Sequence, residues 1–227
     1  MLGKNRMVSS LLIALALISS SQAQGQSQID FRPLTQEMLN DPDPEDWLMW
    51  RGGYNNWGYS PLDQINRENV DQLRLAWSWT FAPAALGSNG MQVEPTVYDG
   101  IMYIRHSDEK YSAHNAATGD LIWQYSRPLP TEIVAGDTRL SVHRGRGVFI
   151  YEDKLISHAT DGTLFALNPS TGALLWESVM TDFRSGAQPS GAPVAFGGSV
   201  VVPYNCTAWT AADPCHMSAY DADNGDL

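Results

Sequence analysis

Short apolar runs, separated by polar or glycine-containing turns, recur in the same order three times along the chain. Each unit opens with an apolar run, a tight turn and a second apolar run, at residues 97–104, 150–156 and 195–202. Two such runs joined by a short turn are typical of a β-hairpin. The pattern therefore predicts antiparallel strands over most of the sequence.

Each unit continues with a third run, a glycine turn and a fourth run that carries tryptophan. The three copies are AHNAATGDLIW at residues 113–123, ALNPSTGALLW at 166–176 and AYDADNGDL at 219–227, so their starts lie 53 residues apart. Four strands in a repeat of this length are the size of a β-propeller blade. We therefore predict an all-β fold, a partial β-propeller built from four-stranded antiparallel blades.

The glycine and tryptophan of the repeat are expected to have structural roles. Gly119, Gly172 and Gly225 should take positive φ in their turns. The tryptophan should pack one blade against the next, because it has the same place in each copy. Trp77 fits the last strand of a preceding unit. The third copy stops at Leu227, before its tryptophan, and we therefore expect the sequence to be a fragment of a longer protein.

The first residues have the pattern of a targeting signal. Lys4 and Arg6 precede an apolar run at residues 8–18, and a small-x-small sequence predicts cleavage near Ala23. The run is short for a bilayer span, so a cleaved signal peptide is favoured over an uncleaved anchor, with no integral membrane span after cleavage. The expected parts are a signal peptide, an N-terminal extension and the propeller repeats, at residues 1–23, 24–45 and 46–227.

Composition narrows the range of partners. The formal net charge is −11, with 14 Lys and Arg against 25 Asp and Glu. Such a chain is a poor match for nucleic acid, whose phosphates require basic side chains, so no nucleic-acid partner is expected. The charge suits a small neutral substrate or a basic protein partner, and it is equally consistent with simple solubility.

The third unit carries an insertion with one cysteine near each end. The spacing from Phe196 to Ala219 exceeds the matching spacing in the other units by eight residues, and the loop holds Cys206 and Cys215. In an exported protein this pattern predicts a disulfide, which would stabilise the fold by roughly 2–3 kcal/mol. Metal binding by the two cysteines with His216 is the alternative.

Beyond the repeat, two stretches give the chain a more specific likeness: residues 46–62 (DWLMWRGGYNNWGYSPL) and residues 65–79 (INRENVDQLRLAWSW). With the blade signature, they resemble the pyrroloquinoline quinone (PQQ)-dependent alcohol dehydrogenases, the quinoprotein family that includes methanol dehydrogenase. The resemblance covers residues 46–227 and implies an eight-bladed propeller in the intact protein. The repeat by itself is shared with non-enzymatic propellers.

The resemblance implies two cofactor-binding residues. Glu94, in MQVEPT, stands where the family has a glutamate before the first blade's opening strand, and Arg146, in RGVFIYEDK, stands where it has an Arg-Gly. PQQ is a planar tricarboxylate with an ortho-quinone, and an arginine fork suits its oxygens. Without the resemblance, each residue is an ordinary surface ion-pair candidate. Because each precedes the first strand of its blade, the two should converge at one end of the propeller axis.

Three places depart from the family pattern. Leu140-Ser141 stands where methanol dehydrogenase-like members have adjacent cysteines, and Ala159 replaces a cofactor-contacting threonine, with Thr160 one step along. Residues 204–209 hold no glutamate where many members have the first calcium ligand. The family's catalytic aspartate and remaining metal ligands would lie beyond residue 227, so no catalytic or metal residue is assigned in this chain.

The histidines add little to this picture. His106, His114, His143 and His158 show no metal-ligand spacing. His143 and His158 are candidates for the same funnel as Arg146, although ordinary turn or face positions are favoured for them.

The resemblance implies a periplasmic oxidoreductase. It would oxidise a small alcohol with PQQ as hydride acceptor, aided by calcium or another metal ion, and pass electrons to a c-type cytochrome. The alternative is a non-catalytic propeller with the same repeats that acts as a protein-assembly scaffold or a binding module.

Overall fold

The computed structural model describes most of the chain after the first 28 residues. The described ranges are 29–80, 92–106, 109–134, 146–185, 187–189, 191–206 and 217–227. The predicted signal peptide, Leu140-Ser141, His143 and Cys215 lie outside them, so the disulfide stays a prediction. Within these ranges no helix combines the length and the apolar character needed to cross a membrane.

The described chain forms three antiparallel sheets, in which the main strands of each blade pair in sequence order. The first blade contains β1 Thr96–Tyr98, β2 Ile101–Arg105, β3 Lys110–Asn115 and β4 Leu121–Ser126. The second contains β5 Phe149–Tyr151, β6 Lys154–His158, β7 Thr163–Leu167 and β8 Leu174–Val179. The third contains β10 Val194–Phe196, β11 Ser199–Cys206 and β12 Met217–Asp221. The predicted order of strands and turns is confirmed.

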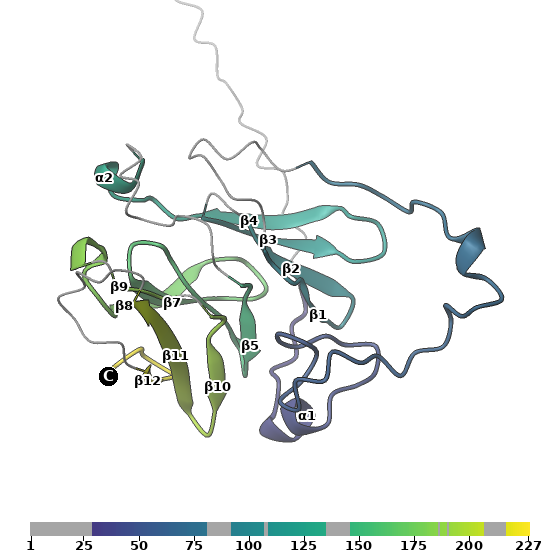
Figure 1. The fold of residues 1–227 in the computed structure, drawn as a ribbon, viewed down its shortest axis with the longest axis horizontal. Helices are drawn as coiled ribbons and strands as arrows, with labels where there is room; N and C mark the ends of the chain where they lie inside the picture. The colour runs from purple at the N-terminus through teal and green to yellow at the C-terminus, as the bar shows by residue number, and fades with distance from the viewer. Residues whose placement is uncertain are drawn as a thin grey trace, which may run out of the picture.

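The three sheets are arranged around a common centre, with the first strand of each innermost (Figure 1). Strand β5 contacts β10, and the Thr96 hydroxyl at the start of β1 donates a 2.9 Å hydrogen bond to the Val148 carbonyl just before β5. The inner strands therefore begin at the same end of the assembly. The hairpin turns at their other end are covered by residues 29–46, which include α1 Gln36–Asn40.

Tryptophan side chains join each blade to the next, as predicted. The indole N–H groups of Trp77, Trp123 and Trp176 donate to the carbonyls of Ala116, Pro169 and Ala222 at 3.0, 2.7 and 3.2 Å. The ring in each case lies directly over the repeat glycine, whose φ is between +71° and +79°. At Gly172, a Cβ atom would lie 2.5 Å from the Trp123 ring. The turn therefore requires glycine for two reasons: the backbone has a positive φ, and the tryptophan ring leaves no room for a Cβ atom.

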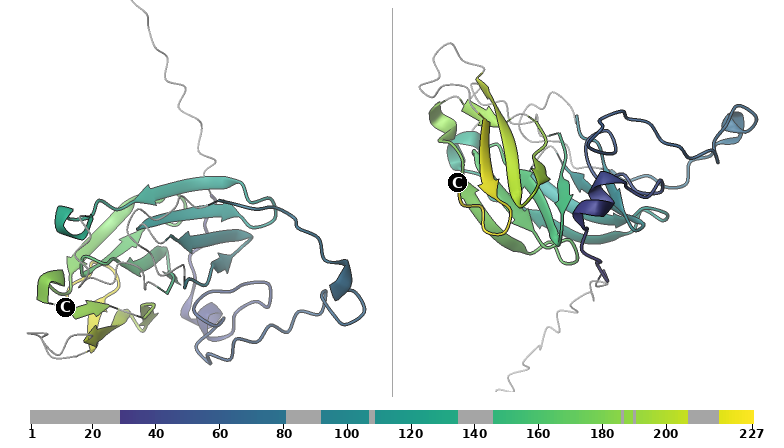
Figure 2. Two further views of the ribbon diagram at one scale, coloured as in Figure 1. Left: turned by 45° about the horizontal axis from the view of Figure 1, so that its top comes forward. Right: turned by 90° about the horizontal axis from the view of Figure 1, so that it is seen from below.

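The segment around Trp77 differs from its prediction. Residues 73–80 form no strand, although the Trp77 ring has the same contact with the first blade that Trp123 has with the second. A strand is defined by hydrogen bonds to a partner strand, and no strand of the described chain pairs with this segment. Residues 57–75 instead form a loop that extends away from the sheets, as Figure 2 shows from two further directions, and the chain returns to the first blade at Trp77.

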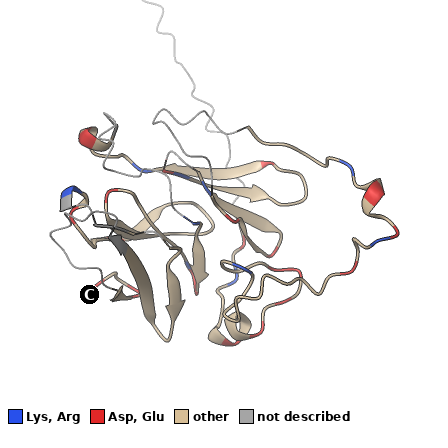
Figure 3. Ribbon diagram, in the orientation of Figure 1, with Lys and Arg blue, Asp and Glu red and all other residues tan. Residues whose placement is uncertain are grey.

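Several small elements were not predicted. They are α1, whose first turn is capped by the Thr35 side chain, and three one-turn helices at η1 Val70–Gln72, α2 Thr131–Val134 and η2 Phe183–Ser185. A short strand, β9 Ala187–Pro189, pairs with the far end of β11. Of these elements, α2, η2 and β9 lie in the connections between blades, which have no counterpart in the repeat. In the described part of the chain, Figure 3 shows the charged residues at scattered positions along the ribbon, many of them in turns and connections.

Candidate functional site

A cavity of about 490 Å³ lies where the inner strands of the second and third blades begin. One wall comes from the residues at and before β5 and β10, and the other from residues 49–56. The lining residues are Met49, Trp50, Gly53, Tyr54, Asn56, Arg146, Phe149, Gly191, Ala192, Pro193 and Val194. Its size and its mainly apolar, aromatic lining are typical of a small-molecule site.

Arg146 is the one charged side chain among these lining residues. Its guanidinium carbon lies 5.8 Å from the centre of the Trp50 ring, within the range of a cation–π contact. The Arg146 side chain is exposed, whereas Trp50 is half-buried. The cavity therefore presents a positive, planar hydrogen-bond donor beside aromatic surfaces.

Glu94 lies at the equivalent end of the first blade, but it does not line this cavity. Its Oε1 atom accepts hydrogen bonds from the Trp47 indole N–H and from the Arg51 backbone N–H, the latter at 3.1 Å. A Cβ atom on Gly147, next to Arg146, would be 3.1 Å from the Glu94 carbonyl oxygen. The structure thus brings Glu94 and Arg146 to the same end of neighbouring inner strands.

The two charged residues do not pair with each other within the described ranges. Each contacts residues 47–51, Glu94 from the first blade and Arg146 from the second. In this part of the chain, neither residue is held by a salt bridge.

A buried histidine supports one wall of the cavity. His158 is almost fully buried, and its Nε2 atom lies 2.5 Å from the carbonyl oxygen of Gly191, a lining residue. A carbonyl only accepts, so Nε2 carries the proton. Burial, together with the nearby Arg105 charge, lowers the pKa of His158 to about 3. His158 is therefore neutral at pH 7 and holds the wall without lining the cavity itself.

Beside His158, a buried ion pair of the first blade contacts the second blade through Thr160. Arg105 and Glu109 are nearly inaccessible and 2.6 Å apart. Burial alone would lower the pKa of Arg105, but the adjacent Glu109 carboxylate raises it. The Thr160 hydroxyl donates to Glu109 at 2.6 Å, as does the Tyr111 hydroxyl at 2.9 Å. Thr160, one step from the family's cofactor-contacting position, is thus bound to an inter-blade carboxylate.

The two histidines of the first blade have structural partners. Ser112 Oγ lies 2.6 Å from His106 Nε2 and 2.8 Å from His114 Nε2. His114 Nδ1 lies 3.1 Å from the Gly119 carbonyl, which can only accept, so Nδ1 carries a proton. Across the described residues, no group of three or more His, Cys, Asp or Glu side chains is arranged to hold a metal ion.

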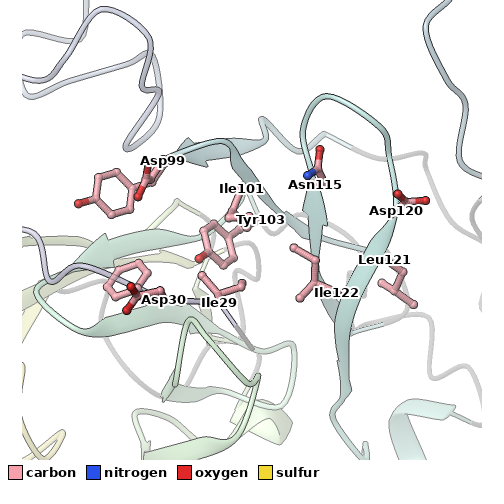
Figure 4. Close-up of a pocket in the computed structure, with 11 residues that line it drawn as sticks. Ile29, Asp30, Asp99, Ile101, Tyr103, Asn115, Asp120, Leu121 and Ile122 are labelled. Carbon is pink, nitrogen blue, oxygen red and sulfur yellow. The ribbon is translucent and has the colours of Figure 1, made fainter. Parts of the chain in front are cut away.

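A second cavity, of about 390 Å³, lies at the opposite strand ends of the first blade (Figure 4). Its floor includes Ile29, Ile101 and the buried Tyr103, while Asp30 and Asp99 are among the three aspartates that line it. Like charges repel at short range. This cavity is therefore a poor match for an anionic ligand, in contrast to the cavity beside Arg146.

The cavity residues that precede the repeats were not predicted from the sequence. Trp50, Tyr54 and Asn56 line the site from a segment that was used only as a family signature. Their signal was the unusual density of aromatic residues at positions 47–59, outside any repeat. Aromatic residues with no repeat partner have no assigned place in a blade, and this could have marked them as candidates.

These features define a β-propeller with a cavity at its inner strand ends that is lined by aromatic residues and Arg146. Residues 47–227 match the family described as "Glucose/ethanol/alcohol dehydrogenase, beta-propeller domain", a PQQ family. The quinoprotein alcohol dehydrogenase PedH of Pseudomonas putida is 31% identical over 193 residues, covering 85% of this chain and 31% of that protein. The chain therefore belongs to the PQQ-dependent β-propeller dehydrogenase family.

Other relatives and solved structures agree. The dehydrogenase subunit of the alcohol dehydrogenase (quinone) of Gluconobacter oxydans is 34% identical, over 83% of this chain and 25% of its own length. The quinohemoprotein alcohol dehydrogenase ADHIIG of Pseudomonas putida HK5 superposes with a TM-score of 0.74 at 28% identity, covering 86% of this chain and 28% of that one. A europium-containing methanol dehydrogenase superposes with a TM-score of 0.69 at 26% identity, covering 84% of this chain and 32% of that one. The chain thus spans about a quarter to a third of the length of these relatives.

Proposed function

We propose that the chain is the N-terminal part of a periplasmic PQQ-dependent alcohol dehydrogenase, and that the cavity beside Arg146 receives part of the cofactor. The proposal is supported by membership of the PQQ family and by the names of the relatives, which are quinoprotein alcohol dehydrogenases. The observation that carries it is the position of Arg146, the one charged lining residue of an apolar, aromatic cavity at the inner strand ends.

The residues of this cavity fit an aromatic polyanion. The Arg146 guanidinium can donate two parallel hydrogen bonds to a carboxylate, and Tyr54 and Phe149 offer apolar surface to a flat ring system. When bound, PQQ supplies an ortho-quinone that accepts a hydride from an alcohol carbon. Arg146 would then hold an anionic edge of the ring system, and the apolar wall would limit the access of water to it.

Glu94 is proposed as the second cofactor-binding residue. Both hydrogen bonds to its carboxylate go to Oε1, and no other bond to it is found in the described chain. Its Oε2 atom is thus available to accept a hydrogen bond from a ligand. The proposal also includes a small alcohol substrate, a c-type cytochrome as electron acceptor and calcium or another metal ion. The described residues offer no fitting metal ligands, so no step is derived through a metal.

The test is cofactor binding by the full-length protein after PQQ has been removed. Isothermal titration with PQQ should show that Arg146→Ala weakens binding about 10- to 100-fold, the range for a lost hydrogen bond to a charged group. Arg184→Ala is the matched control, because Arg184 is also exposed and stacks on an aromatic ring, Phe183 at 4.2 Å, but lies outside the cavity. This control should bind PQQ as the wild type does.

Two results would count against the proposal. An unchanged PQQ affinity in Arg146→Ala would remove the cofactor assignment of the cavity. A full-length wild-type protein that binds no PQQ would instead favour the non-catalytic propeller.

A further inference from the structure

Residues 47–52 form a tight turn that is fixed to the first blade. The backbone N–H and C=O of Trp47 pair with those of Val97, the middle residue of β1, at 2.8 and 2.9 Å. The Gly52 N–H closes the turn onto the Met49 carbonyl at 2.9 Å. Gly52 has φ +90°, and a Cβ atom there would lie 3.2 Å from the Trp47 ring. The turn therefore has little freedom to move relative to β1.

The first tryptophan of this turn orients Glu94. The Trp47 indole N–H and the Arg51 backbone N–H, four residues apart in the turn, both donate to Glu94 Oε1. Two donors on one oxygen fix the rotation of the carboxylate, which leaves Oε2 directed away from the turn. Without the indole donor, the half-buried Glu94 side chain would keep one hydrogen bond and could rotate.

The second tryptophan supports Arg146 from the same turn. The Trp50 ring lies 5.8 Å from the Arg146 guanidinium carbon, although Arg146 belongs to the second blade. Trp50 and Arg146 also face the same cavity. One turn of six residues, 47–52, therefore contacts the charged groups contributed by two blades, and its own position is set by β1.

We propose that Trp47 and Trp50 are positioning residues of the cofactor site, which set Glu94 and Arg146 in place for the ligand. This inference rests on the proposed function. It assigns the two tryptophans a role that ordinary packing would not give them. A tryptophan that only packs would affect stability and leave the affinity for a ligand unchanged.

The experiment measures PQQ affinity and thermal stability together in the full-length, cofactor-depleted protein. Trp47→Phe keeps a ring but removes the N–H donor, and we expect it to weaken PQQ binding about 10-fold, as for the loss of a hydrogen bond to a charged group. Trp50→Leu removes the aromatic face and should weaken binding about 3- to 5-fold, as for an exposed cation–π contact. Trp50→Phe should restore most of that loss.

Trp176→Phe is the matched control. Trp176 is also half-buried, and its indole N–H also makes one hydrogen bond, to the Ala222 carbonyl at 3.2 Å, at a blade interface away from the cavity. Its replacement should lower the melting temperature at least as much as Trp47→Phe does, while PQQ affinity changes less than about 2-fold. Equal PQQ affinities for Trp47→Phe and Trp176→Phe would overturn the inference.

A double-mutant cycle tests whether Trp47 acts through Glu94. In the Glu94→Ala background, Trp47→Phe should cause no further loss of PQQ affinity, because the group that it orients is gone. Fully additive losses would contradict the positioning role. If Glu94→Ala and Arg146→Ala weaken binding but the tryptophan variants do not, the inference alone fails. If none of these variants changes PQQ affinity, the proposed cofactor site fails with it.

Discussion

At the scale of single residues, the glycine of the blade turn is the most constrained position. Gly172→Ala should destabilise the protein by about 3 kcal/mol, because a left-handed backbone and an overpacked contact with Trp123 both add cost. Gly100→Ala is the control, since Gly100 has a similar φ of +73° but nothing within 4 Å of an added Cβ. It should cost only about 1 kcal/mol. Urea unfolding measures both, and equal losses would mean that the Trp123 contact is unimportant.

His158 gives a prediction about acid stability. Its pKa, about 3 in the fold, is below the ordinary value of 6.5, so the unfolded chain binds the extra proton first as the pH falls. The contribution of neutral His158 to the free energy of unfolding is fully present above pH 6.5. Below that pH, this contribution should decline by about 1.4 kcal/mol per pH unit. His158→Gln, which keeps an N–H donor for Gly191, should flatten this part of the curve. Denaturant melts from pH 7 to pH 4 measure the slopes, and parallel slopes for the two proteins would refute the assignment.

At the scale of elements, the blades are joined by buried charge as well as by tryptophan. Glu109→Ala leaves Arg105 buried without its partner and removes the acceptor of Thr160 in the second blade. We expect a loss of about 3 kcal/mol or more in the free energy of unfolding. Glu132→Ala breaks the exposed pair with Arg184 and should leave the unfolding midpoint nearly unchanged. Equal effects in chemical denaturation would mean that the buried pair does not hold the blades together.

The features that recur in every blade were predicted from the sequence, whereas the features that occur only once were not. The hairpins, the positive-φ glycines and the tryptophan contacts follow from residues that recur at a fixed spacing, so each copy supports the others. The turn at residues 47–52, α2 and β9 occur once, and their conformations depend on tertiary partners such as Val97 and Tyr204. The positions of Glu94 and Arg146 were predictable because both precede an inner strand. Their contacts with Trp47 and Trp50 were not, because the backbone pairing of Trp47 with Val97 is not encoded in a local pattern.

At the scale of the whole molecule, this chain exposes much apolar surface. Trp57, Tyr59 and Leu75 are 73%, 71% and 83% exposed, and Met217 in the third blade is 69% exposed. We expect residues 24–227 produced alone to self-associate, because exposed apolar side chains and open strand edges favour association. Light scattering coupled to size-exclusion chromatography measures the mass. A stable monomer with alcohol oxidation activity in the presence of PQQ and calcium would contradict this expectation.

The segment at residues 29–56 also bears on the order in which the molecule can fold. Its Leu34 N–H is bonded to the Glu152 carbonyl, its Tyr54 hydroxyl to the Ala195 carbonyl and its Gln36 side chain to the Gly197 N–H, across as many as 161 residues. Contacts of such large sequence separation slow folding, because the long loop must close before they can form. The part of the chain that is synthesised early thus gains its last partners only after the third blade exists. Docking of this segment, which also carries Trp47 and Trp50, is therefore expected to be a late step, so the site matures after the blades that surround it.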